Sequence, residues 1–220
     1  MATLIRGLDA ARVRANAARV REEIAAAAAR AGRDAGDVAL LAAVKYVPLE
    51  ELGALAEAGL TLLGENRAQQ LEAKAAAYPG VFTWHFIGQL QSRKVRQILP
   101  HVELIHSVAS DSALHQLGRH GGPETRVLVE VNVAGEQSKA GLAPAELDDF
   151  LARCPVQVVG LMTMPPFAED PEASRPYFAR LRGLAAEHGL RELSMGSSQD
   201  YAVAVEEGAT IVRVGSVLYE

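Results

Sequence analysis

The chain has 220 residues, of which 49% are hydrophobic, so it can bury one sizeable core and needs no second domain. Its formal net charge of -5 at pH 7 argues against general binding of nucleic acid, because no basic face is available to neutralise phosphates. The single cysteine excludes an intrachain disulfide framework, and neither a membrane-length apolar run nor a secretory signal is recognisable, so we expect a cytoplasmic protein with one domain over residues 1–220.

Helical and strand-like segments alternate along the chain. An alanine-rich helix is predicted over residues 9–30. Strands are then predicted at 38–45, 60–64, 82–88, 102–107, 126–133, 156–162, 192–195 and 210–214. The helices predicted between them cover 48–58, 67–77, 92–99, 111–117, 144–152, 171–188 and 198–206. This order predicts an α/β fold, a (β/α)8 barrel of the TIM type with an extra N-terminal helix. An open doubly wound sheet is the alternative, but no GxGxxG motif follows the first strand.

Alternation within the strands predicts which side chains point into the barrel. In the strand 126–133, valines occupy one face, and the inward face carries Leu128, Glu130 and Asn132. The same alternation turns inward Ala39, Leu41, Ala43 and Lys45 on the first strand, and Ile211 and Arg213 on the last. Lys45 and Arg213 are therefore expected near the C-terminal mouth, where barrel active sites lie, with Glu130 as a candidate charge partner.

Lys45 closes an apolar run and is the most informative single residue. A lysine at the end of a buried strand is expected to be desolvated, which favours the neutral amine that attacks a carbonyl carbon. This placement predicts a Schiff-base (aldimine) site. The alternative is a lysine whose ammonium group reaches solvent beyond the strand end.

Two glycine-serine turns follow the last two predicted strands. They are the run Ser194, Met195, Gly196, Ser197 and Ser198, and the pair Gly215 and Ser216. Glycine lets the backbone approach an anion closely, serine supplies hydroxyl donors, and the loops after strands seven and eight are the usual phosphate site of this barrel. The alternative is that these serines simply cap helices. Together with Lys45, the turns predict pyridoxal 5′-phosphate (PLP) as the cofactor.

Arg213 would then face the pyridine nitrogen of that cofactor. A guanidinium group keeps its proton at neutral pH, so the ring would be a weaker electron sink than one paired with a carboxylate. We therefore expect little carbanion chemistry. The alternative for Arg213 is a structural ion pair with Glu130 inside the barrel.

Many segments resemble the pyridoxal-phosphate homeostasis proteins (proline synthetase co-transcribed homologues), whose fold-type III barrel is shared with alanine racemase. The most specific match is WHFIGQLQSRK at 84–94. Further matches are LLAAVK at 40–45, GEN at 64–66, HS at 106–107, Asn132, SKAG at 138–141, GLM at 160–162, LSMG at 193–196, Ser198, Asp200 and RVGS at 213–216. Serine at 197 departs from the methionine usual in the family.

The resemblance implies that Lys45 forms the internal aldimine, that Arg213 faces the pyridine nitrogen, and that the two glycine-serine turns hold the phosphate. Asn66 and His85 are expected at or near the ends of the second and third strands, where both could line the mouth, although His85 can also be read as a core histidine. Lys139 is at most a second, weaker contact for the aldehyde. No metal site is predicted.

Members of that family bind PLP without an established catalytic activity. The resemblance therefore implies a carrier or buffer of PLP in vitamin B6 homeostasis, with PLP-dependent enzymes as candidate clients. We expect neither nucleic acid nor membrane as a partner, and a monomer, with a dimer through the N-terminal helix as the alternative. The rival functions are a PLP-dependent amino-acid racemase, which adds a C-terminal β-domain that we do not find here, and a Schiff-base aldolase.

Overall fold

Eight parallel strands close into a barrel in the computed structural model, which describes residues 4–136 and 140–220. The strands are β1 (Ala39–Ala43), β2 (Leu62–Glu65), β3 (Thr83–Phe86), β4 (Leu104–Val108), β5 (Arg126–Glu130), β6 (Gln157–Met162), β7 (Glu192–Ser197) and β8 (Ile211–Val214). They pair in chain order, and β8 returns to β1 in the register Leu41↔Arg213. The predicted TIM-type barrel is confirmed, and the open sheet is excluded.

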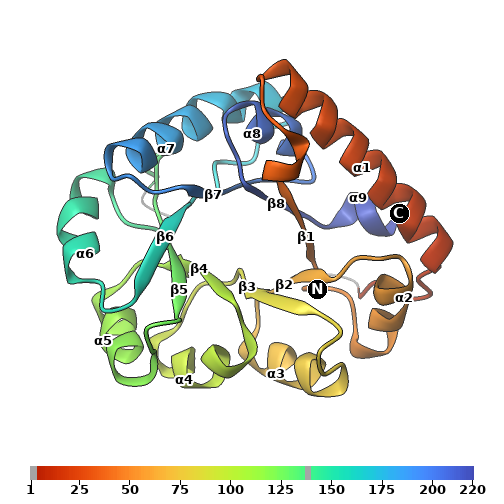
Figure 1. The fold of residues 1–220 in the computed structure, drawn as a ribbon, viewed down its shortest axis with the longest axis horizontal. Helices are drawn as coiled ribbons and strands as arrows, with labels where there is room; N and C mark the ends of the chain where they lie inside the picture. The colour runs from red at the N-terminus through yellow and green to blue at the C-terminus, as the bar shows by residue number, and fades with distance from the viewer. Residues whose placement is uncertain (1–3, 137–139) are drawn as a thin grey trace.

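Helices surround the barrel on its outside (Figure 1). They are α1 (Ala10–Arg30), α2 (Leu52–Glu57), α3 (Ala68–Ala77), α4 (Val95–Ile98), α5 (Asp111–His120), α6 (Leu147–Arg153), α7 (Arg175–Glu187), α8 (Tyr201–Glu206) and α9 (Ser216–Tyr219). Short 3₁₀ turns stand at η1 (Ala35–Asp37), η2 (Leu49–Glu51), η3 (Ser92–Lys94), η4 (Leu99–His101), η5 (Pro144–Glu146) and η6 (Pro171–Ser174). The predicted helix 92–99 is thus split between η3, α4 and η4, and the four-residue α9 was not predicted.

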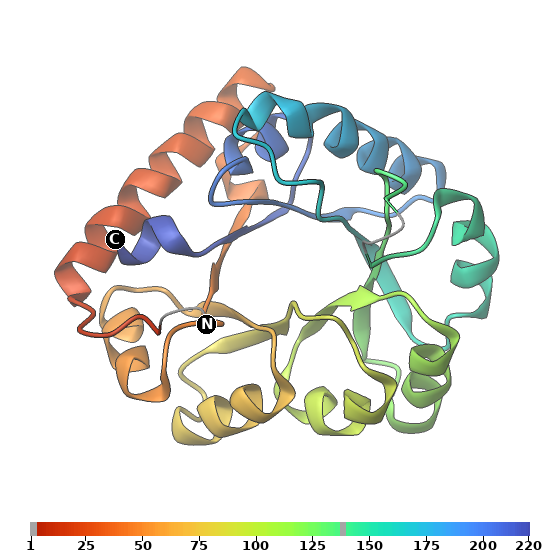
Figure 2. The ribbon, with the colours of Figure 1, turned by 180° about the vertical axis from the view of Figure 1, so that it is seen from behind.

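The N-terminal helix α1 packs along the seam where the barrel closes. Asp9 caps it by accepting a hydrogen bond from the Arg12 amide at 2.7 Å, a contact typically worth about 1 kcal/mol. Its buried side recurs every three or four residues, the period of one helix face: Val13, Ala17, Val20, Ile24, Ala27 and Ala28. In both Figure 1 and Figure 2, α9 lies beside α1, so the two ends of the sequence are brought together there.

The hydrophobic core has two layers, as the strand alternation predicts. The outer layer, between strands and helices, contains the predicted outward valines of β5 together with Val212 and Val214. The inner cluster fills the barrel and consists of Leu41, Leu104, Leu128, Met162 and Ile211. These apolar residues fill the interior of the barrel, so the inward-facing polar side chains lie nearer its C-terminal mouth.

Several strand ends differ from the prediction. Strand β1 stops at Ala43, two residues before Lys45, because the chain turns at residues 45–46. Conversely, β7 continues to Ser197 and takes in part of the predicted phosphate turn, with an irregular register to β8 between Ser194 and Ser197. Gly196 lies at this irregularity with φ +90°, which L side chains rarely adopt. No helix in the described ranges is long and apolar enough to cross a membrane.

Candidate functional site

Lys45 lies in the turn after β1 and is exposed. Its Nζ is 4.9 Å from the centroid of the Tyr46 ring, close enough for a cation–π contact. The prediction that Lys45 is desolvated is therefore wrong. The strand ends early, and the turn carries the side chain out to solvent, which is the alternative considered above. Accessibility, rather than burial, is what this lysine offers to an incoming aldehyde.

Arg213 on β8 points into the barrel and is only 8% exposed. Its Nη2 donates to the Thr163 carbonyl oxygen at 3.0 Å, and its Nη1 donates to Ser194 Oγ. Burial lowers the pKa of Arg213 to about 10, against the opposing pull of the Asp200 and Glu130 carboxylates. The guanidinium group is thus still protonated at neutral pH. Its direct partners are Ser194 and Thr163, and Glu130 acts on it through space.

A buried chain of hydrogen bonds extends from Arg213 across the barrel. Ser194 Oγ lies 2.8 Å from His106 Nδ1, and His106 Nε2 lies 2.9 Å from His85 Nδ1. Burial lowers the pKa of His85 to about 4 and that of His106 well below its usual range, so both rings are neutral at pH 7. If Ser194 Oγ donates to His106 Nδ1 and His106 Nε2 donates to His85 Nδ1, each of the two hydrogen bonds has one donor and one acceptor.

These buried hydrogen bonds show which of the predicted site residues belong to the core of the barrel. His85 is a buried histidine hydrogen-bonded to His106, which agrees with the alternative of a core histidine. His106 was quoted above only as part of a family match, and nothing in its local sequence distinguishes it from other histidines on strands. Met195 is buried in the outer core layer, so only its backbone is available to an anion.

The two glycine-serine turns lie next to each other. The Gly215 amide donates to Ser198 Oγ at 3.0 Å, which leaves the Ser198 hydroxyl proton available to a phosphate oxygen. Ser197 is engaged differently, because its amide and hydroxyl both donate to Asp200 Oδ1, at 2.7 and 3.0 Å. Ser216 is the exposed first residue of α9. The hydroxyl groups of Ser198 and Ser216 are therefore the better-placed donors for an anion, while the Gly215 amide holds Ser198 in place.

The residues at the end of β8 and β7 share one cavity. Arg213, Gly196, Ser197 and Asp200 line a space of about 160 Å³ together with the loop after β6. That loop carries Met164 and Phe167, which are 56% and 74% exposed. The predicted meeting of the inward arginine with the first glycine-serine turn is thus seen in the structure.

Asn66 follows β2 and has a buried side-chain oxygen, Oδ1, without a hydrogen-bond partner. It lines a cavity of about 140 Å³ with Gln89, Gln91 and Lys94. Leaving a buried acceptor unsatisfied costs about 1–3 kcal/mol, so a ligand that donates a hydrogen bond there would recover that energy. This orphaned acceptor fits a polar ligand at the mouth. The predicted contact at Lys139 lies outside the described residues.

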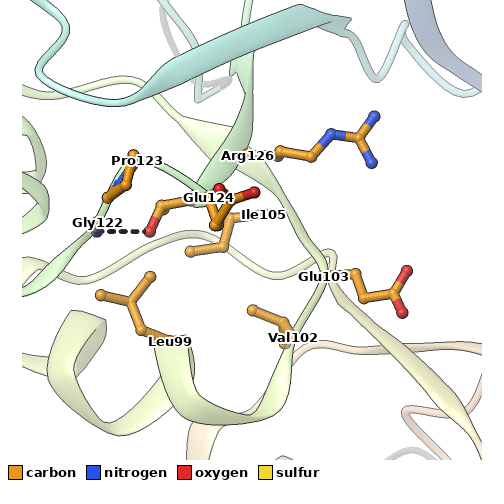
Figure 3. Close-up of a pocket in the computed structure, with 9 residues that line it drawn as sticks. Leu99, Val102, Glu103, Ile105, Gly122, Pro123, Glu124 and Arg126 are labelled. Atoms are coloured by element: carbon orange, nitrogen blue, oxygen red, sulfur yellow. Dashed lines mark hydrogen bonds between the residues drawn. The ribbon is translucent and has the colours of Figure 1, made fainter.

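A larger cavity, of about 510 Å³, opens at the opposite end of the barrel, between the segments that precede β4 and β5. Figure 3 shows Leu99, Val102 and Ile105 near one another, with the charged groups of Glu103 and Arg126 pointing away from them. None of the predicted site residues lines this cavity. A cavity of about 590 Å³ is lined by Ser198, Gln199 and Asp200 after β7, so cavity volume does not favour the end of the barrel where β4 and β5 begin.

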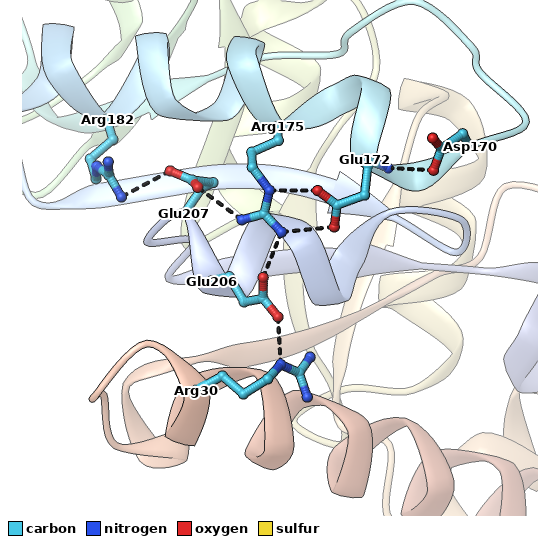
Figure 4. A network of polar contacts seen from close by, with 7 residues as sticks. All are labelled: Arg30, Asp170, Glu172, Arg175, Arg182, Glu206 and Glu207. Carbon is cyan, nitrogen blue, oxygen red and sulfur yellow. Dashed lines mark hydrogen bonds and ion pairs between the residues drawn. The ribbon is translucent and has the colours of Figure 1, made fainter.

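A surface network of ion pairs holds α8 in place after the first glycine-serine turn (Figure 4). Arg175 contacts Glu172, Glu206 and Glu207 at 2.6 to 2.9 Å, and Arg30 of α1 reaches Glu206 at 2.6 Å. Partly exposed pairs of this kind contribute about 0–1 kcal/mol each. Their value here is that they join α1, α7 and α8. Among the residues with described positions, no cluster of His, Cys, Asp and Glu could hold a metal ion.

Comparison with known proteins identifies the class to which this barrel belongs. The family model described as "Alanine racemase, N-terminal domain" matches residues 8–220. A "Pyridoxal phosphate homeostasis protein" of Aquifex aeolicus is 42% identical over 215 residues, which cover 91% of this chain and 94% of that protein. The chain belongs to the alanine racemase N-terminal domain family and, within it, to the pyridoxal phosphate homeostasis proteins.

Solved structures agree with this assignment. PipY of Synechococcus elongatus, determined with PLP bound, is 35% identical, with a TM-score of 0.74 over 84% of this chain and 93% of that one. Alanine racemase from Corynebacterium glutamicum shares the fold at 16% identity and a TM-score of 0.69, covering 96% of this chain but 61% of the racemase chain. The family resemblance and the fold expected from the sequence are confirmed.

Proposed function

We propose that this protein binds PLP, holds it covalently through Lys45, and acts as a carrier or buffer in vitamin B6 homeostasis. The relatives carry the name of that function, and PipY was solved with PLP bound. The structural observation that supports it best is the pairing of β1 with β8, in which Ala42 lies opposite Val214, so that the segments leading to Lys45 and to Gly215 leave the barrel side by side. An ideal Cβ on Gly215 would lie 3.7 Å from Ala43 Cβ, so the two loops are in contact.

The side chains at the mouth fit the parts of that cofactor. Lys45 offers an accessible amine for the aldehyde, while the Ser198 and Ser216 hydroxyls offer donors for the phosphate and the Gly215 amide holds Ser198 Oγ. Ser194, Met195, Gly196 and Ser197 would frame this anion site from β7. PLP supplies an electrophilic aldehyde that captures amines. In the proposed set, Asn66 offers its unpaired Oδ1, and His85 would act only indirectly, through its contacts with His106 and Ser194.

Arg213 argues for a carrier over a robust enzyme. With a pKa of about 10 it stays protonated at neutral pH, so it can donate a hydrogen bond to a pyridine nitrogen but does not transfer a proton to it. A ring left unprotonated withdraws electrons weakly, which disfavours cleavage of bonds at an amino acid's α-carbon. The curated relatives are likewise named for homeostasis and not for a reaction.

The proposal also covers the location of the protein in the cell, its oligomeric state and its partners. We place the protein in the cytoplasm, as a single binding domain over residues 1–220, monomeric by default, with PLP-dependent enzymes as candidate recipients. The alternative function is an amino-acid racemase of the same barrel type. Exchange of the α-proton of free amino acids decides between them, because sustained turnover by the PLP-loaded protein would overturn the carrier function.

The direct test is borohydride reduction of the protein supplied with PLP, followed by mass mapping of its lysine peptides. We expect a pyridoxyl-phosphate adduct on the Lys45 peptide and none in Lys45→Ala. The Lys74 peptide serves as an internal control, because Lys74 is only 1% exposed. An unmodified Lys45 in the presence of excess PLP would overturn the proposed function.

A further inference from the structure

A second lysine, Lys74 on α3, is buried against the turn that carries Lys45. Its Nζ donates to the Val44 carbonyl oxygen at 2.9 Å, and Val44 is the residue immediately before Lys45. Lys74 is 1% exposed and also forms an ion pair with Glu65, which is fully buried at the end of β2. A charged amine is thus used inside the protein to hold one peptide group.

Glu65 uses both of its carboxylate oxygens. Oε1 accepts hydrogen bonds from the amides of Asn66 and Arg67, at 2.7 and 3.1 Å, and Oε2 accepts from Lys74. Taking two charges out of water costs several kcal/mol per ion, which only good geometry and further hydrogen bonds offset. These contacts bring together the ends of β1 and β2 and the inner side of α3. Because the pair is neutral overall, its effect on the Lys45 turn is one of geometry and not of net charge.

Two further segments hold the same turn. The Tyr219 hydroxyl of α9 donates to the Ala43 carbonyl oxygen at 3.2 Å, and the Ile5 amide donates to the Tyr46 carbonyl oxygen at 2.9 Å. Burial and the nearby Glu65 carboxylate raise the pKa of Tyr219 above its usual range, so the hydroxyl stays a donor. The backbone on both sides of Lys45 is therefore fastened to three distant parts of the chain.

We propose that Lys74, paired with Glu65, is a positioning residue for Lys45. The inference rests on the proposed role of Lys45 as the point of PLP attachment. The exposed Lys45 side chain contacts the Tyr46 ring, so the direction of its amine depends on the backbone of the turn. Lys74 holds the Val44 carbonyl group from the buried side of the turn, and its own side chain is not accessible to solvent. A displacement of about 1 Å at a reacting group can cost on the order of 100-fold in rate, so such a clamp matters for attachment.

The test uses a variant that removes the pair without leaving a buried charge: Lys74→Met combined with Glu65→Gln. Glutamine keeps an oxygen for the Asn66 and Arg67 amides, and methionine fills the space of the lysine stem. We expect the variant to fold but to attach PLP at Lys45 about tenfold more slowly or more weakly than the wild type, followed by the absorption of the Schiff base. Tyr219→Phe should give a smaller loss, since it removes one uncharged hydrogen bond.

A control separates positioning from stability. Leu117→Ala truncates a fully buried side chain in α5 and should cost about 2–5 kcal/mol without touching the turn. It should attach PLP like the wild type at a temperature where both are folded. A readout without cofactor is amide hydrogen exchange of a peptide covering residues 43–47, which should speed up in the double variant and not in Leu117→Ala.

The outcomes distinguish the two proposals. A wild type that leaves Lys45 unmodified overturns the proposed function. The positioning role is overturned if the wild type is modified at Lys45 and the folded double variant attaches PLP equally well, with amide exchange at residues 43–47 equally slow. Lys74 and Glu65 would then be structural residues.

Discussion

The Gly215 amide donates a hydrogen bond to Ser198 Oγ at 3.0 Å, although the two residues are 17 apart in the sequence. This contact joins the loop after β7 to the loop after β8 at the mouth of the barrel. Neither glycine-serine turn is specific on its own, since such turns commonly cap helices. Joined in this way, they bring the Ser198 hydroxyl and the first residue of α9, Ser216, to neighbouring positions where both could donate to a phosphate group.

Ser198→Ala tests this contact as part of an anion site. Hydrogen bonds to charged groups contribute about 1.5–3 kcal/mol, so we expect the affinity for PLP to fall by about tenfold or more. The affinity for pyridoxal, which has no phosphate, should be nearly unchanged. Ser110→Ala removes a serine that caps α5 and is the control. Equal losses for PLP and pyridoxal would contradict a phosphate role for Ser198.

Gly196→Ala should be destabilising. Besides the positive φ, an ideal Cβ at this position would lie 2.6 Å from Ala204 Cβ and 2.9 Å from Tyr201 Cα, so α8 would have to move. We expect a loss of about 1–3 kcal/mol in the free energy of unfolding, measured by urea denaturation. Gly183→Ala in α7 is the matched control, because its Cβ would meet nothing within 4 Å and alanine favours helices by about 0.5–1 kcal/mol. A neutral Gly196→Ala would show that the loop is not sterically fixed.

Arg213→Met should also reduce stability, through the groups that it leaves behind. The Thr163 carbonyl would lose its Arg213 donor inside the barrel, at a cost of about 1–3 kcal/mol, whereas Ser194 would lose one contact but keep its hydrogen bond with His106. The control is Arg180→Met, since Arg180 donates to the Val133 carbonyl from an exposed position, where water can replace it. Similar urea midpoints for the two variants would argue against a structural role for the buried contacts.

The buried histidines predict a loss of stability in mild acid. The pKa of His85 is lowered to about 4 from an unfolded value of 6.5, so below pH 6.5 the unfolded chain takes up a proton that the folded chain refuses. Stability is therefore fully present above pH 6.5 and falls toward pH 4, by up to about 3 kcal/mol for this residue. His106, with a pKa also well below 6.5, acts in the same direction.

The same pH window contains one opposing group. Burial raises the pKa of Glu130, so the folded protein binds that proton more readily and gains stability as the pH falls. His85→Gln isolates the histidine contribution, and its urea midpoints between pH 7.5 and 5 should fall less steeply than those of the wild type. Parallel curves would mean that His85 already titrates normally in the folded state.

The sequence predicted the barrel and the direction of its side chains well, because both depend on local periodicity. The valines of β5 lie under the helices and Leu128 lies inside, as period-two alternation requires. The prediction from the sequence was wrong for the exposure of Lys45, because the residue at which a strand ends and a turn begins depends on contacts with distant parts of the chain. The contact of His106 with Ser194, 88 residues away, carries no local signal at all.

Lys74 is an intermediate case. It stands three residues after Leu71, on the face of α3 that also buries Ala68, so helical periodicity alone directs it inward. What the periodicity of the helix could not supply was the partner of Lys74, since Glu65 lies outside the helix, at the end of β2. A lysine on an apolar helix face is therefore a useful sequence signal for a buried ion pair, provided that an acidic residue lies near a neighbouring strand end.

The adjacency of β1 and β8 also has a consequence for biosynthesis. The segment carrying Lys45 leaves the ribosome well before Arg213, Gly215 and the Tyr219 hydroxyl that holds Ala43, because all three lie far downstream in the sequence. A growing chain therefore has the reactive lysine long before it has the rest of the proposed pocket. Cofactor loading at the complete proposed pocket would therefore wait until β8 has been made and has docked against β1.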